Sequence, residues 1–347
     1  MRDRAKITKT ANIILRVIIF IITYGFIFHE VFLHRAWEGV SGSLLNLFSN
    51  PWLVAELMGI LFLMAVNWGT EAMKWRFMIG KIEKVSFLKS CQAVLTGVSI
   101  SSFMPNRTGE FFGRVFILEK GSHMEGILIT ILGSMSQLLI TILAGSLAIL
   151  FFLPDNFPSF PGSSGFLYTG IVIITLTFDL ILILLFFNVS LLSFVKGKWL
   201  KGKIFSKTRR FFDVFSYYNF KELATVLMLS LFRYGVFSCQ FFLLLKIFHV
   251  PVPVADGLIL IPMIFFILTV VPSSIMTDLG IRGSAALYIF GLFFTRYGIQ
   301  ADAMNLGVLT ASTLIWVINL LIPAILGTFF LFRLKFFRKE PVVIVNA

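Results

Sequence analysis

The stretch "SSFMPNRTGEFFGR", residues 101–114, follows an apolar run and places two arginines and a glutamate within eight residues. If its second half is helical, Arg107, Glu110 and Arg114 lie at i, i+3 and i+7, along one face. Glu110 can then pair with either arginine. Charged side chains are costly inside a membrane and usually mark a polar cavity there. The role of this stretch therefore depends on whether the neighbouring segments lie in the membrane.

The composition predicts an all-α polytopic membrane protein. Of the 347 residues 58% are hydrophobic, 14% are charged and 41 are phenylalanine, and several apolar runs reach the roughly 20 residues that span a bilayer. The first run, residues 13–28, is expected to stay as a helix, because no small-residue cleavage site follows it. Two isolated cysteines and four scattered histidines favour no metal site, and we expect no cofactor.

The net charge of +13 comes from basic residues that gather in a few segments, which the positive-inside rule assigns to the cytoplasm. These basic segments are residues 2–9, 74–89, 194–221 and 333–339. The other connections are nearly free of lysine and arginine. We therefore expect both termini and the basic loop 194–221 on the cytoplasmic side of the inner membrane, and no nucleic-acid partner.

Under this rule the crossings can be counted. About six spanning helices are expected, near residues 11–28, 52–73, 125–152, 166–189, 222–248 and 304–332. Two further segments, residues 91–120 and 257–296, must then begin and end on the same side of the membrane. A re-entrant helical hairpin satisfies this condition in each case. The turns are expected at Pro105 and Asn106, and at Pro272 and Ser273.

The two halves of the chain repeat one order of elements, namely helix, helix, re-entrant hairpin and helix. The order runs through residues 1–155 and again, in the opposite orientation, through residues 160–335. Inverted repeats with broken helices near the membrane midplane are a recurring design of transporters. We therefore interpret residues 1–347 as one integral-membrane domain with an inverted repeat.

Both hairpins combine small residues with charges. Gly109 and Gly113 have the small-xxx-small spacing that lets two helices approach closely. Gly280 and Gly283 also permit a close approach in the second hairpin. Arginines beside a helix N-terminus can hold a phosphate through two parallel hydrogen bonds. The charges of the first hairpin also fit an interfacial segment in which Arg and Glu pair for structural reasons.

Further charges extend the candidate site. Asp278 and Arg282 lie at i, i+4 in the second hairpin, and Asp179 and Arg233 stand inside expected spans. The last two can pair with each other or with the hairpins, and Asp179 can also relay a proton. The candidate substrate-binding residues are therefore Arg107, Glu110, Arg114, Asp179, Arg233, Asp278 and Arg282; no catalytic residue is assigned.

Two motifs of the chain match those of a known family. The first matches at Pro105, Arg107, Gly109, Glu110 and Arg114, and the second at Pro272, Gly280, Ile281 and Arg282. In these motifs the chain resembles the flippase-like transmembrane domain of lysylphosphatidylglycerol synthases, although Gly283 stands where the family has a glutamate. The resemblance covers nearly the whole chain. It implies a free-standing member without the synthase domain, in which two re-entrant hairpins enclose a lipid-headgroup cavity.

We expect flippase- or scramblase-like transbilayer movement of an anionic phospholipid or a lipid-linked substrate. Two alternatives stay open: a membrane enzyme or enzyme partner in lipid or glycolipid modification, and an ion-coupled transporter of a small anion. No nucleophile and base accompany the charged motifs, so we expect that the chain is not an enzyme. The expected partners are membrane lipids, with a second copy of the chain or a lipid-modifying enzyme as further candidates.

Overall fold

The computed structural model describes residues 50–101, 108–119, 121–156, 166–188, 213–271 and 275–331. Within these ranges the chain is helical and forms no strand. Five stretches are long and apolar enough to cross a membrane: Pro51–Ile79, His123–Pro154, Phe166–Phe187, Phe220–Ile247 and Met304–Phe330. The chain is therefore a multi-pass membrane protein, as its composition predicts. The expected first span, residues 11–28, lies outside the described residues.

Helix α3 (Pro51–Ile79) is longer than the sequence suggested. It begins at Asn50, whose side chain accepts a hydrogen bond from the backbone N–H of residue 52 at 3.0 Å. Because it continues past residue 73, Lys74 lies inside the helix, and the expectation of a loop position for Lys74 is wrong. Lys74 is 2% exposed. Its Nζ lies 2.9 Å from the carboxylate of Glu71, which lowers the cost of burying the charge.

Helices α4 (Phe87–Ser101) and α5 (Gly109–Val115) form the first hairpin. Glycines bring the two helices into direct contact. A Cβ added to Gly113 would lie 2.6 Å from the Cα of Gly97, and one added to Gly109 would lie 2.6 Å from a backbone oxygen of α4. The interpretation of Gly109 and Gly113 as close-approach residues is confirmed.

The next three long helices follow the expected spans closely. They are α6 (His123–Asn156), α7 (Phe166–Phe187) and α10 (Phe220–Ile247). Helix α10 begins at a capping box, in which the side chain of Asn219 accepts from the backbone N–H of Glu222 and the side chain of Glu222 accepts from that of Asn219. This local signal fixes the start of α10.

A buried tyrosine ties the connection before α10 to the end of α3. The 3₁₀ helix η2 (Asp213–Tyr217) leads to Tyr218, whose hydroxyl donates a hydrogen bond of 2.8 Å to the backbone oxygen of Met78. Burial raises the pKa of Tyr218, so the phenol stays a hydrogen-bond donor at neutral pH.

Helices α11 (Val254–Val270) and α12 (Ile275–Arg296) form the second hairpin. A Cβ on Gly283 would lie 3.0 Å from the Leu309 side chain, so a neighbouring helix does pass closely there. A Cβ on Gly280 would meet open space, and the expected close approach at Gly280 is therefore wrong. Only one of the two glycines faces a packed surface.

The last crossing is a single long helix with a widened turn in its middle. Helix α13 (Ala301–Trp316) continues through the π-helical segment η3 (Val317–Leu321) into α14 (Ile322–Leu331). Asn319 lies in the widened turn and is 7% exposed. Single π-turns inside α-helices often mark functional sites.

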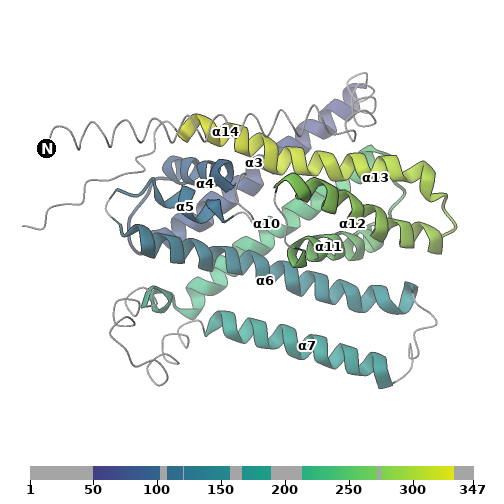
Figure 1. Cartoon of the computed structure of the whole chain (residues 1–347), viewed down its shortest axis with the longest axis horizontal. Helices are drawn as coiled ribbons and strands as arrows, with labels where there is room; N and C mark the ends of the chain where they lie inside the picture. The colour runs from purple at the N-terminus through teal and green to yellow at the C-terminus, as the bar shows by residue number, and fades with distance from the viewer. Residues whose placement is uncertain are drawn as a thin grey trace, which may run out of the picture.

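The two hairpins lie at opposite ends of the bundle, between α6 and the α13–α14 helix (Figure 1). Helix α4 packs against α14, α11 packs against α6, and α3 packs against α10. Each hairpin therefore rests on the last long helix of the other half of the chain. Helix α7 lies along the edge of the bundle and packs mainly on α6 (Figure 1). The inverted repeat and the re-entrant position of the hairpins stay predictions.

The buried apolar core falls into two clusters, one around each hairpin. The first contains Trp68 and Trp316, and the second contains Phe265 and Ile315. These four residues meet at a common cavity, so the candidate site lies where the two halves of the core join.

Candidate substrate cavity

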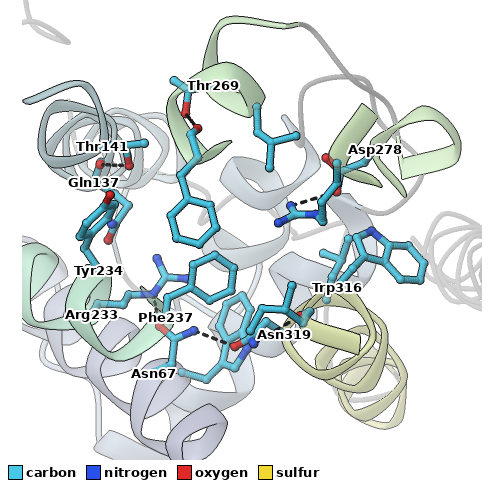
Figure 2. A pocket seen from close by; sticks show the side chains of 16 residues that line it. Asn67, Gln137, Thr141, Arg233, Tyr234, Phe237, Thr269, Asp278, Trp316 and Asn319 are labelled. Carbon is cyan, nitrogen blue, oxygen red and sulfur yellow. Dashed lines mark hydrogen bonds and ion pairs between the residues drawn. The ribbon is translucent and has the colours of Figure 1, made fainter. Parts of the chain in front are cut away.

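A cavity of about 270 Å³ is lined by sixteen residues, whose side chains Figure 2 shows from close by. Helices α3, α6, α10, α11 and α12 and the α13–η3 turn all contribute to it. The lining residues are Asn67, Trp68, Gln137, Thr141, Arg233, Tyr234, Phe237, Phe265, Leu268, Thr269, Asp278, Arg282, Ile315, Trp316, Asn319 and Leu320. Half of these residues are polar or charged, so the walls combine aromatic and aliphatic faces with many polar groups.

Arg233 is held in one position on the cavity wall. Its Nε donates to the Asn67 side-chain oxygen at 2.9 Å, and its Nη1 lies 3.0 Å from the Glu71 carboxylate. The guanidinium also lies over the Trp68 ring, 5.1 Å from its centroid. The Asn67 amide donates in turn to the side-chain oxygen of Asn319 at 2.9 Å. The widened turn of η3 therefore helps to orient the arginine from a distance.

A buried ion cluster stands behind Arg233. The Glu71 carboxylate lies 2.7 Å from Arg114 Nη1 and 2.9 Å from Lys74 Nζ, in addition to its contact with Arg233. Arg114 also pairs with Glu110. The side chains of Glu71, Lys74 and Arg114 are 2–3% exposed. One carboxylate therefore serves three cations from three helices, α3, α5 and α10.

The cluster carries a surplus of positive charge. Among the described residues Lys74, Arg114 and Arg233 share the two carboxylates Glu71 and Glu110, which leaves one formal positive charge in excess. Burying an excess charge is costly unless a counter-ion completes it. Arg233 borders the cavity, so an anion in the cavity would meet this charge directly.

The opposite wall belongs to the second hairpin. Asp278 lies across the cavity from Arg233 (Figure 2). The Arg282 Nη2 lies 3.4 Å from the Asp278 carboxylate one turn earlier on α12, which confirms the expected pair. The Nε and Nη1 of Arg282 are buried and have no hydrogen-bond partner among the described residues. Arg282 is therefore a second donor that faces the cavity.

The transmembrane region of lysylphosphatidylglycerol synthases has a family model that matches residues 13–327 of this chain. The chain belongs to this family. Comparisons with curated proteins and with solved structures find no match. Membership identifies the chain as a membrane domain linked to lipid modification, and the resemblance inferred from the two motifs is confirmed.

The family motifs contribute unequally to the cavity. From the first motif, Arg114 and Glu110 belong to the buried cluster and not to the cavity wall. Arg107 and the turn residues Pro105, Asn106, Pro272 and Ser273 lie outside the described residues. From the second motif, Arg282 reaches the cavity directly.

Asp179 lies apart from these residues. Its carboxylate accepts a hydrogen bond of 2.8 Å from the Ser146 hydroxyl, which joins α7 to α6. Arg233 pairs with Glu71, so the alternative of an Asp179–Arg233 pair is wrong. Asp179 does not line the cavity, and its expected role in binding substrate has no support from the geometry.

The centre of the cluster consists of residues that are not among the predicted site residues. Asn67, Glu71 and Lys74 recur at i, i+4 and i+7, so they lie on one face of an otherwise apolar helix. This spacing can be read from the sequence and predicts a polar face on the helix. The predicted helix, however, ended at residue 73. Lys74 was therefore assigned to a loop, and the three residues were not recognised as one polar face. Among the described residues no three His, Cys, Asp or Glu side chains gather in a way that could hold a metal ion.

Proposed function

We propose that this membrane domain moves an anionic phospholipid, or a lipid-linked anion, between the leaflets of the membrane. The headgroup passes through the central cavity while the acyl chains stay in the lipid phase. The observation that carries the proposal is the buried cation surplus at Arg233, on the wall of a cavity between the two hairpins. A headgroup phosphate in the cavity can act as a counter-ion for this surplus.

Arg233 and Arg282 are the phosphate-binding residues in this proposal. They stand on two separate helices of the second half of the chain, α10 and α12, so a phosphate between them contacts both helices at once. At an effective dielectric constant of about 20, a phosphate roughly 4 Å from one guanidinium gains about 4 kcal/mol. Such contacts offset part of the cost of taking a charged headgroup through the membrane interior.

The packing of the hairpins supports passage through both halves. Helix α4 packs on α14 and α11 packs on α6, the pairing that two repeats related by a two-fold axis would produce. With the basic segments on the cytoplasmic side, the proposal places the chain in the inner membrane with both termini in the cytoplasm. The two hairpins then enter from opposite faces; the second lines the cavity, and the first contacts the ion cluster behind Arg233.

The test is lipid exchange in vesicles that contain the purified chain. Fluorescent phosphatidylglycerol is distributed over both leaflets, and dithionite quenches only the outer one; wild-type protein should let the quench proceed beyond that leaflet. Arg233→Gln should slow the exchange about 10- to 100-fold, because it loses one charge-assisted contact to the phosphate. Arg296→Gln removes an exposed arginine at the end of α12 and should change nothing.

Vesicles that behave like empty ones, for each anionic lipid tried, would overturn the proposal. Equal rates for wild type and Arg233→Gln would overturn the assignment of the site. Lipids recovered after the assay should have unchanged masses, because the proposal includes no covalent step. A new lipid mass that depends on the protein would point to an enzyme instead.

A further inference from the structure

The cavity contains both hydrogen-bond donors and hydrogen-bond acceptors. Together they restrict the chemistry of the headgroup further than the positive charge of the cavity does. We propose that the ligand of the cavity carries several hydroxyl groups next to its phosphate, as sugar- and polyol-phosphate lipids do. This inference rests on the proposed function for its lipid and extends it to the chemistry of the headgroup.

The donors are two buried indoles and the arginine of the second hairpin. Trp68 and Trp316 are 7% and 2% exposed, and both line the cavity. The Nε1 of each has no hydrogen-bond partner among the described residues. Buried donors are nearly always satisfied in proteins, so oxygen atoms of a ligand are the partners that these two indoles and Arg282 call for.

The acceptors lie on α6 and α11. The side-chain oxygen of Gln137 is buried without a partner among the described residues. The hydroxyls of Thr141 and Thr269 donate to the backbone oxygens of Gln137 and Phe265, at 3.0 and 2.9 Å. Their own oxygens therefore remain as acceptors toward the cavity, and Figure 2 shows Gln137 and Thr141 together on one side of it.

Hydroxyl groups satisfy both sets with one kind of group. A phosphodiester offers acceptors alone, and an ammonium group offers donors alone. A hydroxyl group both donates and accepts, so several hydroxyls can pair with the indole N–H groups and with the Gln137 and threonine oxygens at once. The aromatic wall adds a flat apolar face, where Phe237 stacks on Phe265 with ring centroids 4.8 Å apart. Such a face suits the C–H side of a sugar or polyol.

The size of the cavity agrees with a headgroup. At about 270 Å³ it lies just below the ~300–1,000 Å³ of typical ligand pockets, which leaves room for a hydroxylated ring but not for acyl chains as well. The same cavity holds the charge that binds the phosphate. One molecule can therefore use both features.

The experiment compares three labelled lipids with the same single phosphodiester charge: phosphatidylinositol, phosphatidylglycerol and phosphatidylethanol. Their headgroups carry many hydroxyls, two hydroxyls and none. Two or three added hydrogen bonds predict that the full chain exchanges the inositol lipid about 10- to 100-fold faster than the ethanol lipid, with the glycerol lipid between them.

Two variants tie this ranking to the cavity. Gln137→Met keeps the size of the side chain and removes the acceptor, and Trp316→Phe removes an N–H donor. Each should lower the ratio of inositol-lipid exchange to ethanol-lipid exchange several-fold. Trp52→Phe changes an indole that is 81% exposed at the start of α3 and serves as the control. Equal rates for the three lipids, or an unchanged preference in both variants, would overturn the inference.

A binding measurement separates this inference from the proposed function. Short-chain versions of the three lipids are added to the purified chain, and the shift in its melting temperature is recorded. If no lipid exchanges in vesicles, transbilayer movement fails, yet a larger shift with the inositol lipid that Gln137→Met abolishes would still support the hydroxylated ligand. Equal shifts would overturn it. Free inositol phosphate should shift the melting temperature much less; an equal shift would assign the site to a soluble sugar phosphate.

Discussion

Replacing Glu71 with glutamine is the most direct perturbation of the buried cluster. The substitution keeps the size of the side chain and one acceptor oxygen, but it removes the carboxylate that serves three cations. Glu71 lies 2.7 Å from Arg114, 2.9 Å from Lys74 and 3.0 Å from Arg233. Without it the described cluster carries three formal positive charges against the single carboxylate of Glu110.

The expected loss of stability is large. Removing one partner of a buried ion pair typically costs about 3–5 kcal/mol, because the remaining charge stays buried without compensation. Three cations lose their shared partner here, so we expect the upper part of that range. The double variant Glu71→Gln with Lys74→Met removes one of these cations as well, restores the original surplus of one charge, and should recover at least half of the loss.

The assay is unfolding in mixed micelles with a rising fraction of SDS, followed by tryptophan fluorescence. Glu119→Gln is the matched control, since it removes an exposed carboxylate whose partner is Lys89. Its curve should superimpose on that of the wild type. If the Glu71→Gln curve superimposed on both, or if adding Lys74→Met destabilised the protein further, the charge argument would be refuted.

Two further predictions concern the packing. Gly113→Ala should separate α4 from α5, because its Cβ would lie 2.6 Å from the Gly97 Cα. The shifted hairpin would displace Arg114, so lipid exchange should slow by at least about tenfold. The control is Gly280→Ala, whose Cβ meets open space and which should match the wild type in the same vesicle assay. Tyr218→Phe should lower the free energy of unfolding by about 1 kcal/mol, since it removes the hydrogen bond to Met78. Its exchange rate should stay unchanged, and a clear loss of exchange would give Tyr218 a role beyond stability.

Local signals in the sequence predicted much of the architecture. The spans follow from apolar length, and the two helix pairs α4–α5 and α11–α12 appear where the count of crossings required a turn. The pair Asp278–Arg282 and the contact at Gly113 depend on residues close in the sequence or on one helical face, so spacing alone was informative. In these cases a spacing of about one helical turn along a single helix marks the residues that pair or that permit close packing.

The partners of Arg233 were beyond such reasoning. Glu71 is 162 positions away in the sequence, and only the rotation and depth of α3 and α10 bring the two side chains together. Asp179 stands at a similar place within an apolar helix, yet it faces Ser146 on α6. An intramembrane charge therefore predicts that a polar partner is present, but the packing of the helices determines which residue that partner is.

The position of Arg114 changes how the first hairpin takes part in the proposed function. Arg114 holds one oxygen of Glu71 while Arg233 and Lys74 share the other, so Arg114 draws on the same negative charge that would neutralise Arg233. The first hairpin thus sets the charge at the cavity wall from behind, whereas the second hairpin places Arg282 on the wall itself. At Gly283, where the family has a glutamate, even a Cβ would lie 3.0 Å from Leu309, so a longer side chain requires the neighbouring helix to move. Asp278 supplies the carboxylate for Arg282 from one turn earlier, which leaves the tight helix contact intact.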